Sequence, residues 1–177
     1  MKILFLDMDG VCNSKQHFMM IKHIEVPPAE TLSDADLFMM KLTTNANNMW
    51  VLKYILEQVP DLKIVISSAW RLHYQMDSFT ELFKIYGLPT DRIIDKTPKK
   101  FSSERVHEIH MWLDDYKENH GHEVDWIALD DHVIFNLEDP DKKREFLTEP
   151  WAGVTMKDAF AIIKHFKPQY HQPFYEI

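Results

Sequence analysis

The chain has 177 residues, enough for one domain with a single sizeable hydrophobic core. Apolar residues make up 45% and charged residues 27%, and the formal net charge of −8 argues against non-specific binding to duplex nucleic acid. No stretch approaches the roughly 20 apolar residues that span a bilayer, and the apolar run before Asp7 is too short for a signal peptide. Because Cys12 is the only cysteine, no internal disulfide can form, and we expect a soluble, cytoplasmic protein.

Strand and helix patterns alternate along the chain. Continuous apolar runs predict strands, and apolar residues at helical spacing predict helices. In chain order these are a strand at 3–6, a helix at 45–58, a strand at 62–68, a helix ending near Gly87, a short strand at 91–95, a helix at 103–119, a strand at 124–131, a weaker strand at 151–155 and a last helix around 159–166. The capping-box spacing of Ser78 and Glu81 predicts where the helix before Gly87 begins.

This order predicts an α/β fold, with a parallel sheet covered by helices on both faces. Residues about 14–44 lie between the first strand and the first long helix, which leaves room for a hairpin flap or a very small cap. We therefore expect a single domain over residues 1–177, with this small insert and no large cap domain.

Three predicted strands end in polar side chains that can do chemistry. Ligands bind at the carboxyl ends of the strands in such sheets. Residues two apart in an extended segment point to the same side, about 7 Å apart, so Asp7 and Asp9 face one place, and Gly10 permits a tight turn after them. Carboxylates gathered there would repel one another without a cation, and Mg²⁺ prefers oxygen ligands. The other strand-end residues are Ser67, Ser68, Asp130 and Asp131.

These motifs carry a resemblance to a known superfamily. The stretches "LDMDGV", "IVISS" and "ALDD", in this order, resemble the haloacid dehalogenase-like (HAD-like) phosphatases. More narrowly, "SSAWR", "GLPTDRII", "TP", "EIHMWL" and "ALDD" resemble the small phosphatase-like domain of RNA-repair ("Swiss army knife") proteins. The similarity runs from Lys2 to about Phe166, and it implies a Rossmann-like sheet and a phosphoric monoester hydrolase.

The resemblance also implies a role for each strand-end residue. Asp7 would be the nucleophile that forms an aspartyl-phosphate, and Asp9 would be the general acid and then the base. Asp7, the backbone carbonyl of Asp9 and Asp130 would hold Mg²⁺, with Asp131 assisting directly or through water. Ser67 would hydrogen-bond the transferring phosphoryl group.

Two of these assignments have alternatives. Physical reasoning alone does not separate Ser67 from Ser68, and only the family position favours Ser67. A cation should neutralise the phosphoryl charge in the transition state. Arg105 matches the RNA-repair pattern best for this role, and Lys99 or Lys100 is the alternative.

Three further residues lie close in the sequence to the strand-end motifs, and for Trp70 and Arg71 a structural role is weighed against a functional one. Trp70 is expected to be a packing residue rather than a base-stacking platform. Arg71 is as readily a structural salt bridge as a phosphate contact. His132, beside the acid pair, is the histidine closest to the predicted site.

The implied function is a Mg²⁺-dependent phosphatase. The RNA-repair resemblance, together with the absence of a large cap, implies a substrate with a terminal phosphate on RNA, DNA or a nucleotide, and an oligonucleotide end is one such substrate. One alternative is a small-metabolite phosphatase that uses the insert as a lid. Another is a non-catalytic module that binds phosphate or Mg²⁺. Neither a membrane nor stable duplex nucleic acid is an expected partner.

Overall fold

Five parallel strands form the central sheet of this protein. The computed structural model describes residues 1–25, 32–99 and 104–171. The strand order is β3-β2-β1-β4-β5, so β1 is central, and Leu6 of β1 pairs with Ile66 of β2 and Leu129 of β4. The strands are β1 (Lys2–Leu6), β2 (Leu62–Ile66), β3 (Ile93–Lys96), β4 (Asp125–Asp130) and β5 (Glu145–Leu147). This register brings the carboxyl ends of β2, β1 and β4 to one edge.

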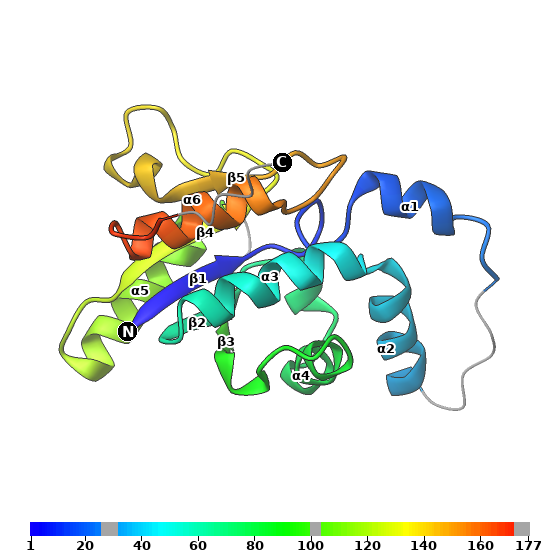
Figure 1. Ribbon diagram of the computed structural model, residues 1–177. Coiled ribbons are helices and arrows are strands. Elements are labelled where there is room, and N and C mark those ends of the chain that lie inside the picture. The colour runs from blue at the N-terminus through cyan, green and yellow to red at the C-terminus, as the bar shows by residue number, and fades with distance from the viewer. Residues whose placement is uncertain (26–31, 100–103, 172–177) are drawn as a thin grey trace.

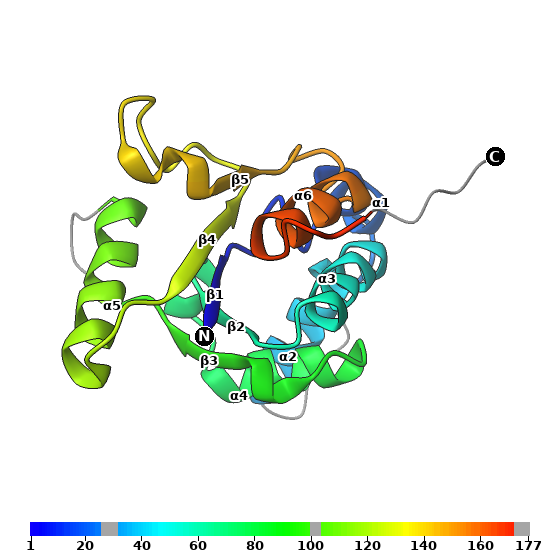
Figure 2. The same ribbon diagram turned by 60° about the vertical axis from the view of Figure 1, so that its left-hand side comes forward.

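Helices cover both faces of the sheet (Figures 1 and 2). The helices are α1 (Lys15–Ile21), α2 (Leu32–Thr43), α3 (Ala46–Gln58), α4 (Met76–Ile85), α5 (Arg105–His120) and α6 (Met156–Phe166). Buried side chains of α3, α4 and α6 share one core cluster, and those of α5 belong to the cluster on the opposite face. The predicted α/β architecture is confirmed.

Side-chain alternation along β1 divides the core between these two clusters. Leu4 and Leu6 pack on the side of α3, whereas Phe5 packs toward α5 with its ring 5.5 Å from Trp112. The same alternation turns Asp7, two residues after Phe5, toward the side of α5. The apolar pattern of the strand therefore decides which helix faces the first acid.

The predicted start of α4 is wrong. Ser78 is not its cap, because the helix already begins at Met76, with Gln75 as an N-cap that makes no side-chain bond. Met76 packs against the apolar core, and this packing extends the helix before the capping-box residues. Its predicted end is confirmed, since Gly87 follows the helix at φ +67°.

The predicted strand at 151–155 is also wrong. The last strand, β5, comes earlier and pairs with Ala128, Leu129 and Asp130 of β4. Residues around 151–153 instead form a turn, in which the amides of Ala152 and Gly153 both donate to the carbonyl of Glu149. A backbone closed on itself in this way cannot join the sheet.

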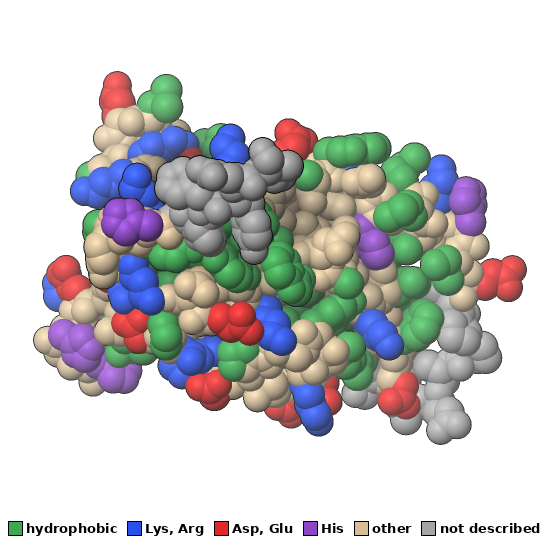
Figure 3. All heavy atoms as spheres, viewed as in Figure 1, with side chains coloured by type: hydrophobic (Ala, Val, Ile, Leu, Met, Phe, Trp, Pro, Cys, Tyr) green, Lys and Arg blue, Asp and Glu red, His purple; other side chains and the backbone are tan. Residues whose placement is uncertain are grey.

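The insert at 14–44 is helical where the structure describes it, rather than a hairpin. Met40 of α2 is fully buried in the core, whereas no residue of α1 is buried. Hydrophobic side chains gather on the surface over α1, where Phe18, Met19 and Met20 are exposed (Figure 3). None of the described helices combines the length and apolar character of a bilayer-crossing segment.

Candidate active site

Three buried polar residues meet at the carboxyl edge of the sheet. Asp7 directly follows β1, Ser67 directly follows β2, and Asp130 is the last residue of β4. The sheet pairing continues past the strand ends, because the Asp7 amide donates to the Leu129 carbonyl at 3.0 Å and the Ser67 amide to the Leu6 carbonyl at 2.8 Å. These backbone bonds hold the three side chains at fixed positions beside one another.

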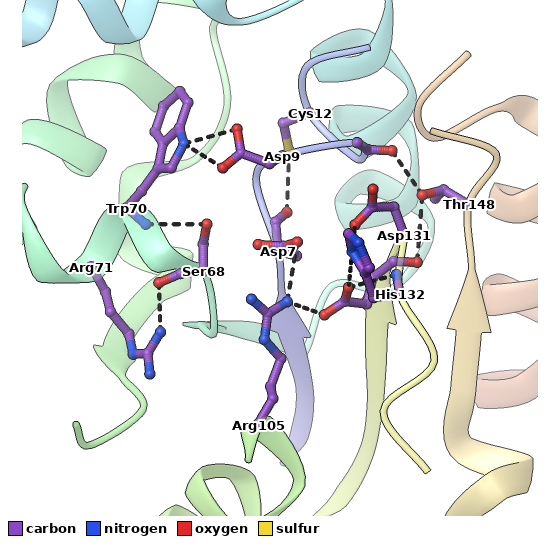
Figure 4. Close-up of polar contacts among 12 residues, drawn as sticks. Asp7, Asp9, Cys12, Ser68, Trp70, Arg71, Arg105, Asp131, His132 and Thr148 are labelled. Atoms are coloured by element: carbon purple, nitrogen blue, oxygen red, sulfur yellow. Dashed lines mark hydrogen bonds and ion pairs between the residues drawn. The ribbon is translucent and has the colours of Figure 1, made fainter. Parts of the chain in front are cut away.

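Arg105, the first residue of α5, contacts both Asp7 and Asp130, and Figure 4 shows its guanidinium directed at Asp7. Its Nη1 is 3.1 Å from Asp7 Oδ2 and also donates to Asp130 Oδ2. Of the three candidate cations, Arg105 is thus in the site. Lys99 is exposed at the surface, and Lys100 lies outside the described residues.

The environment of Asp7 opposes its ionisation. Burial is the largest effect and, with the charge of Asp130, it raises the pKa of Asp7 from 3.8 to about 6. Arg105 and a hydrogen bond from Ser68 act in the opposite direction, toward a lower pKa, without cancelling the effect of burial. A cation bound beside Asp7 would therefore stabilise its ionised form.

A tight turn after β1 places the next part of the site. Gly10 has φ +70°, and its amide donates to Asn13 Oδ1 at 2.9 Å. Its carbonyl accepts from the Thr148 hydroxyl at 2.8 Å, which ties the turn to the segment after β5. A Cβ at Gly10 would lie 2.6 Å from the Cβ of Asp131, so the turn and this second acid pack without space for a side chain.

We expect Gly10→Ala to destabilise the protein by about 1–3 kcal/mol and to lower activity by displacing Asp131. Gly121→Ala is the matched control, because Gly121 has φ +73° and a Cβ added there would have nothing within 4 Å among the described residues. Thermal unfolding of both variants separates the backbone cost, which they share, from the clash. Equal losses of stability in the two variants would show that Asp131 moves aside without destabilising the protein.

The expectation that Asp7 and Asp9 face one place is wrong, because the Asp7 carboxylate is directed at Arg105 whereas the Asp9 carboxylate is directed at Trp70, in the segment after β2 (Figure 4). The Oδ1 atom of Asp9 accepts from Asn13 Nδ2 at 2.8 Å, and Trp70 Nε1 lies 3.0 Å from both oxygens of the Asp9 carboxylate (Figure 4). Trp70 therefore does more than the packing predicted for it, although its ring also contacts Tyr74 edge-on at 5.5 Å.

The two serines after β2 differ in their contacts. Ser68 Oγ accepts from the Trp70 amide at 3.3 Å and hydrogen-bonds Asp7. Ser67 Oγ is buried and has no hydrogen-bond partner among the described residues. A buried hydroxyl without a partner has a hydrogen bond available for a ligand. The choice of Ser67 over Ser68 as the phosphate-binding serine stays a prediction.

Arg71 forms a structural ion pair, the first of its two predicted roles. Its guanidinium pairs with Glu108 of α5, and both side chains are at most 9% exposed. It also donates to the carbonyls of Ser68 at 2.7 Å and Thr97 at 3.1 Å. Arg71 thus joins the loop after β2 to the helix that carries Arg105.

Asp130, Asp131 and His132 form a candidate cation-binding group. One ligand atom from each lies within 4.8 Å of the others. The backbone amide of His132 donates to Asp130 Oδ1 at 2.9 Å. The His132 ring contacts the Asp131 carboxylate, and the His132 side chain is 82% exposed. A cavity of about 410 Å³ is lined by Arg105, Asp130 and His132, so this side of the site borders an open space, whereas Asp7, Asp9 and Ser67 are not among the lining residues.

Three contributors to the site were not predicted in their observed roles: Asn13, Trp70 and Thr148. The contacts of Asn13 are local, and an Asn shortly after Gly10 is a turn signal that points to it. The bonds from Trp70 to Asp9 and from Thr148 to Gly10 join residues 61 and 138 positions apart, and no sequence pattern indicates them.

This edge of the sheet is the ligand-binding position of an open α/β fold, and its buried acids, arginine and free hydroxyl suit a phosphorylated ligand. Residues 3–159 match the family described as the HAD domain in Swiss Army Knife RNA repair proteins, and the chain belongs to this family. No curated protein and no solved structure matches the chain significantly. The predicted resemblance is confirmed at the level of the family.

Proposed function

We propose that the protein is a Mg²⁺-dependent phosphatase that hydrolyses phosphomonoesters through an aspartyl-phosphate on Asp7. The observation that carries this proposal is the placement of Asp7, buried at the end of the central strand and paired with Arg105. A buried nucleophile beside one cation and one unsatisfied hydroxyl, that of Ser67, suits in-line attack on a phosphoryl group.

In the proposed reaction Asp7 Oδ attacks phosphorus while the bond to the leaving oxygen breaks. Asp9 gives its proton to that oxygen and becomes a carboxylate. Asp9 then takes a proton from water, whose oxygen attacks phosphorus and releases Asp7 and inorganic phosphate. Arg105 and the Ser67 hydroxyl bind the phosphoryl oxygens, where negative charge is concentrated.

The acidic groups fit a hard divalent cation. Asp7, Asp130 and Asp131 supply carboxylate oxygens, and the raised pKa of Asp7 reflects burial and negative charge that Arg105 leaves partly unbalanced. Asp7, the Asp9 carbonyl and Asp130 would hold Mg²⁺, with Asp131 directly or through water. The ion would supply charge neutralisation that lets a phosphate dianion approach these acids.

For the substrate we propose a terminal phosphate on RNA, DNA or a nucleotide. The family description refers to RNA repair proteins, and the cavity beside Arg105 opens to solvent. The insert consists of two helices where it is described, of which α1 has no buried residue, so its described part does not form a large cap over the site. An open site can admit the end of a long chain.

Phosphate release, with and without Mg²⁺, tests this function. The substrates are an aryl phosphate and oligonucleotides phosphorylated at the 5′ or the 3′ end. We expect Mg²⁺-dependent release, faster from an oligonucleotide than from the aryl phosphate. Release from the aryl phosphate alone would move the substrate to small molecules, and no release from any of them would contradict the phosphatase proposal.

A further inference from the structure

The indole of Trp70 makes an unusual contact with the second acid of the site. Its Nε1 lies 3.0 Å from both oxygens of the Asp9 carboxylate. Trp70 lies in the short 3₁₀ helix Ala69–Leu72 after β2, whereas Asp9 follows β1. We propose that Trp70 is a positioning residue for the general acid, which holds Asp9 toward the leaving group. This inference rests on the proposed phosphatase function and adds a residue that acts through Asp9.

Asn13 complements Trp70 and distinguishes the two oxygens of Asp9. Asn13 Oδ1 accepts from the Gly10 amide, so its Nδ2 must face Asp9 Oδ1. Oδ1 therefore accepts from both Asn13 and Trp70, whereas Oδ2 accepts from Trp70 alone among the described residues. Oδ2 keeps a lone pair available, and we assign the transferable proton to it.

An indole suits this task because its N–H donates and cannot accept. It can hold the carboxyl group before and after proton transfer without competing for the proton. Trp70 is itself held by its own amide, which donates to Ser68 Oγ at 3.3 Å, and by the ring of Tyr74. A rigid donor fixes the direction in which the Asp9 proton points.

The proton of Asp9 matters most when the leaving oxygen is a poor leaving group. In the first step Asp7 forms a bond to phosphorus, the ester P–O bond breaks, and the Asp9 proton neutralises the departing oxygen. An acidic phenol can leave as the phenolate without receiving a proton, whereas a weakly acidic phenol needs the proton from Asp9 in order to leave. Loss of positioning should therefore appear as a stronger dependence of rate on the leaving group.

The test is Trp70→Phe with a series of phenyl phosphates whose phenols span a range of acidity. Phenylalanine keeps a ring against Tyr74 and removes the N–H. We expect kcat/KM to fall about 10- to 100-fold for the least acidic phenol and about threefold or less for the most acidic. Trp50→Phe is the control, because Trp50 is 58% exposed on α3 and contacts no site residue that is described.

The comparison between phenols within one variant is insensitive to partial unfolding, because a loss of folded enzyme lowers the rate for every phenyl phosphate by the same factor. An equal loss for all phenols, or no loss for any, would overturn the role of Trp70 while the phosphatase function stands. If the wild-type protein releases no phosphate in an Asp7-dependent way, the proposed function fails and the inference fails with it.

Discussion

Asp7→Asn is expected to remove phosphatase activity and, at neutral pH, to make the protein more stable. As the proposed nucleophile, Asp7 has no substitute in the site, so we expect a loss of kcat on the order of 10⁴-fold or more. The gain in stability has a separate cause, which is the cost of keeping this carboxylate ionised in a buried position.

The sign of the pH dependence follows from the raised pKa. In the unfolded chain Asp7 loses its proton near its ordinary pKa of 3.8, whereas in the folded protein its pKa is about 6. Between these values the folded state binds more protons, so the free energy of unfolding falls as pH rises from about 4 to 6. Asparagine cannot ionise, so the variant should gain about 1–3 kcal/mol above pH 6 and little near pH 4.

Thermal unfolding at pH 4 and pH 7.5, in chelator and in Mg²⁺, measures this gain. If Asp7 holds Mg²⁺ as proposed, the ion should stabilise the wild-type protein more than the variant, because it would bind the folded state through Asp7. A variant that is less stable than the wild type at pH 7.5 in chelator would contradict the assignment of a buried carboxylate whose ionisation destabilises the folded protein.

Arg71→Met should cause the largest loss of stability among the substitutions considered. The Arg71–Glu108 pair is buried, and removing one partner of such a pair costs about 3–5 kcal/mol because the other charge stays in a poorly solvated place. The variant also loses the bonds to the Ser68 and Thr97 carbonyls. We expect lower activity as well, since Arg71 joins the loop after β2 to α5.

Chemical denaturation of three variants isolates the buried pair. Lys84→Met removes an ion pair with Glu81, whose side chain is 49% exposed, and should cost at most about 1 kcal/mol. Adding Glu108→Leu to Arg71→Met should recover part of the loss, because both charges are then gone. A cost for Arg71→Met no greater than that for Lys84→Met would show that the pair contributes little.

The sequence predicted the strand ends well because the signal there is local. A continuous apolar run that stops at an acid indicates both a buried strand and its carboxyl end, as at Asp7 and Asp130. The errors arose where the local signal was weak. Ser78 has the spacing of a cap, but packing of Met76 extended α4, and the weakly apolar stretch at 151–155 closed into a turn at Gly153.

The sequence by itself determined the fold class and indicated that acids follow two of the buried strands, because the succession of strands and helices along the chain and the end of an apolar run are local patterns. Only the tertiary structure decided the partners of those acids. It placed Arg105 against Asp7 and Asp130, and it brought Trp70 to Asp9. Such contacts depend on how α5 and the loop after β2 pack against the sheet, and residues distant in the chain carry no local mark of that packing.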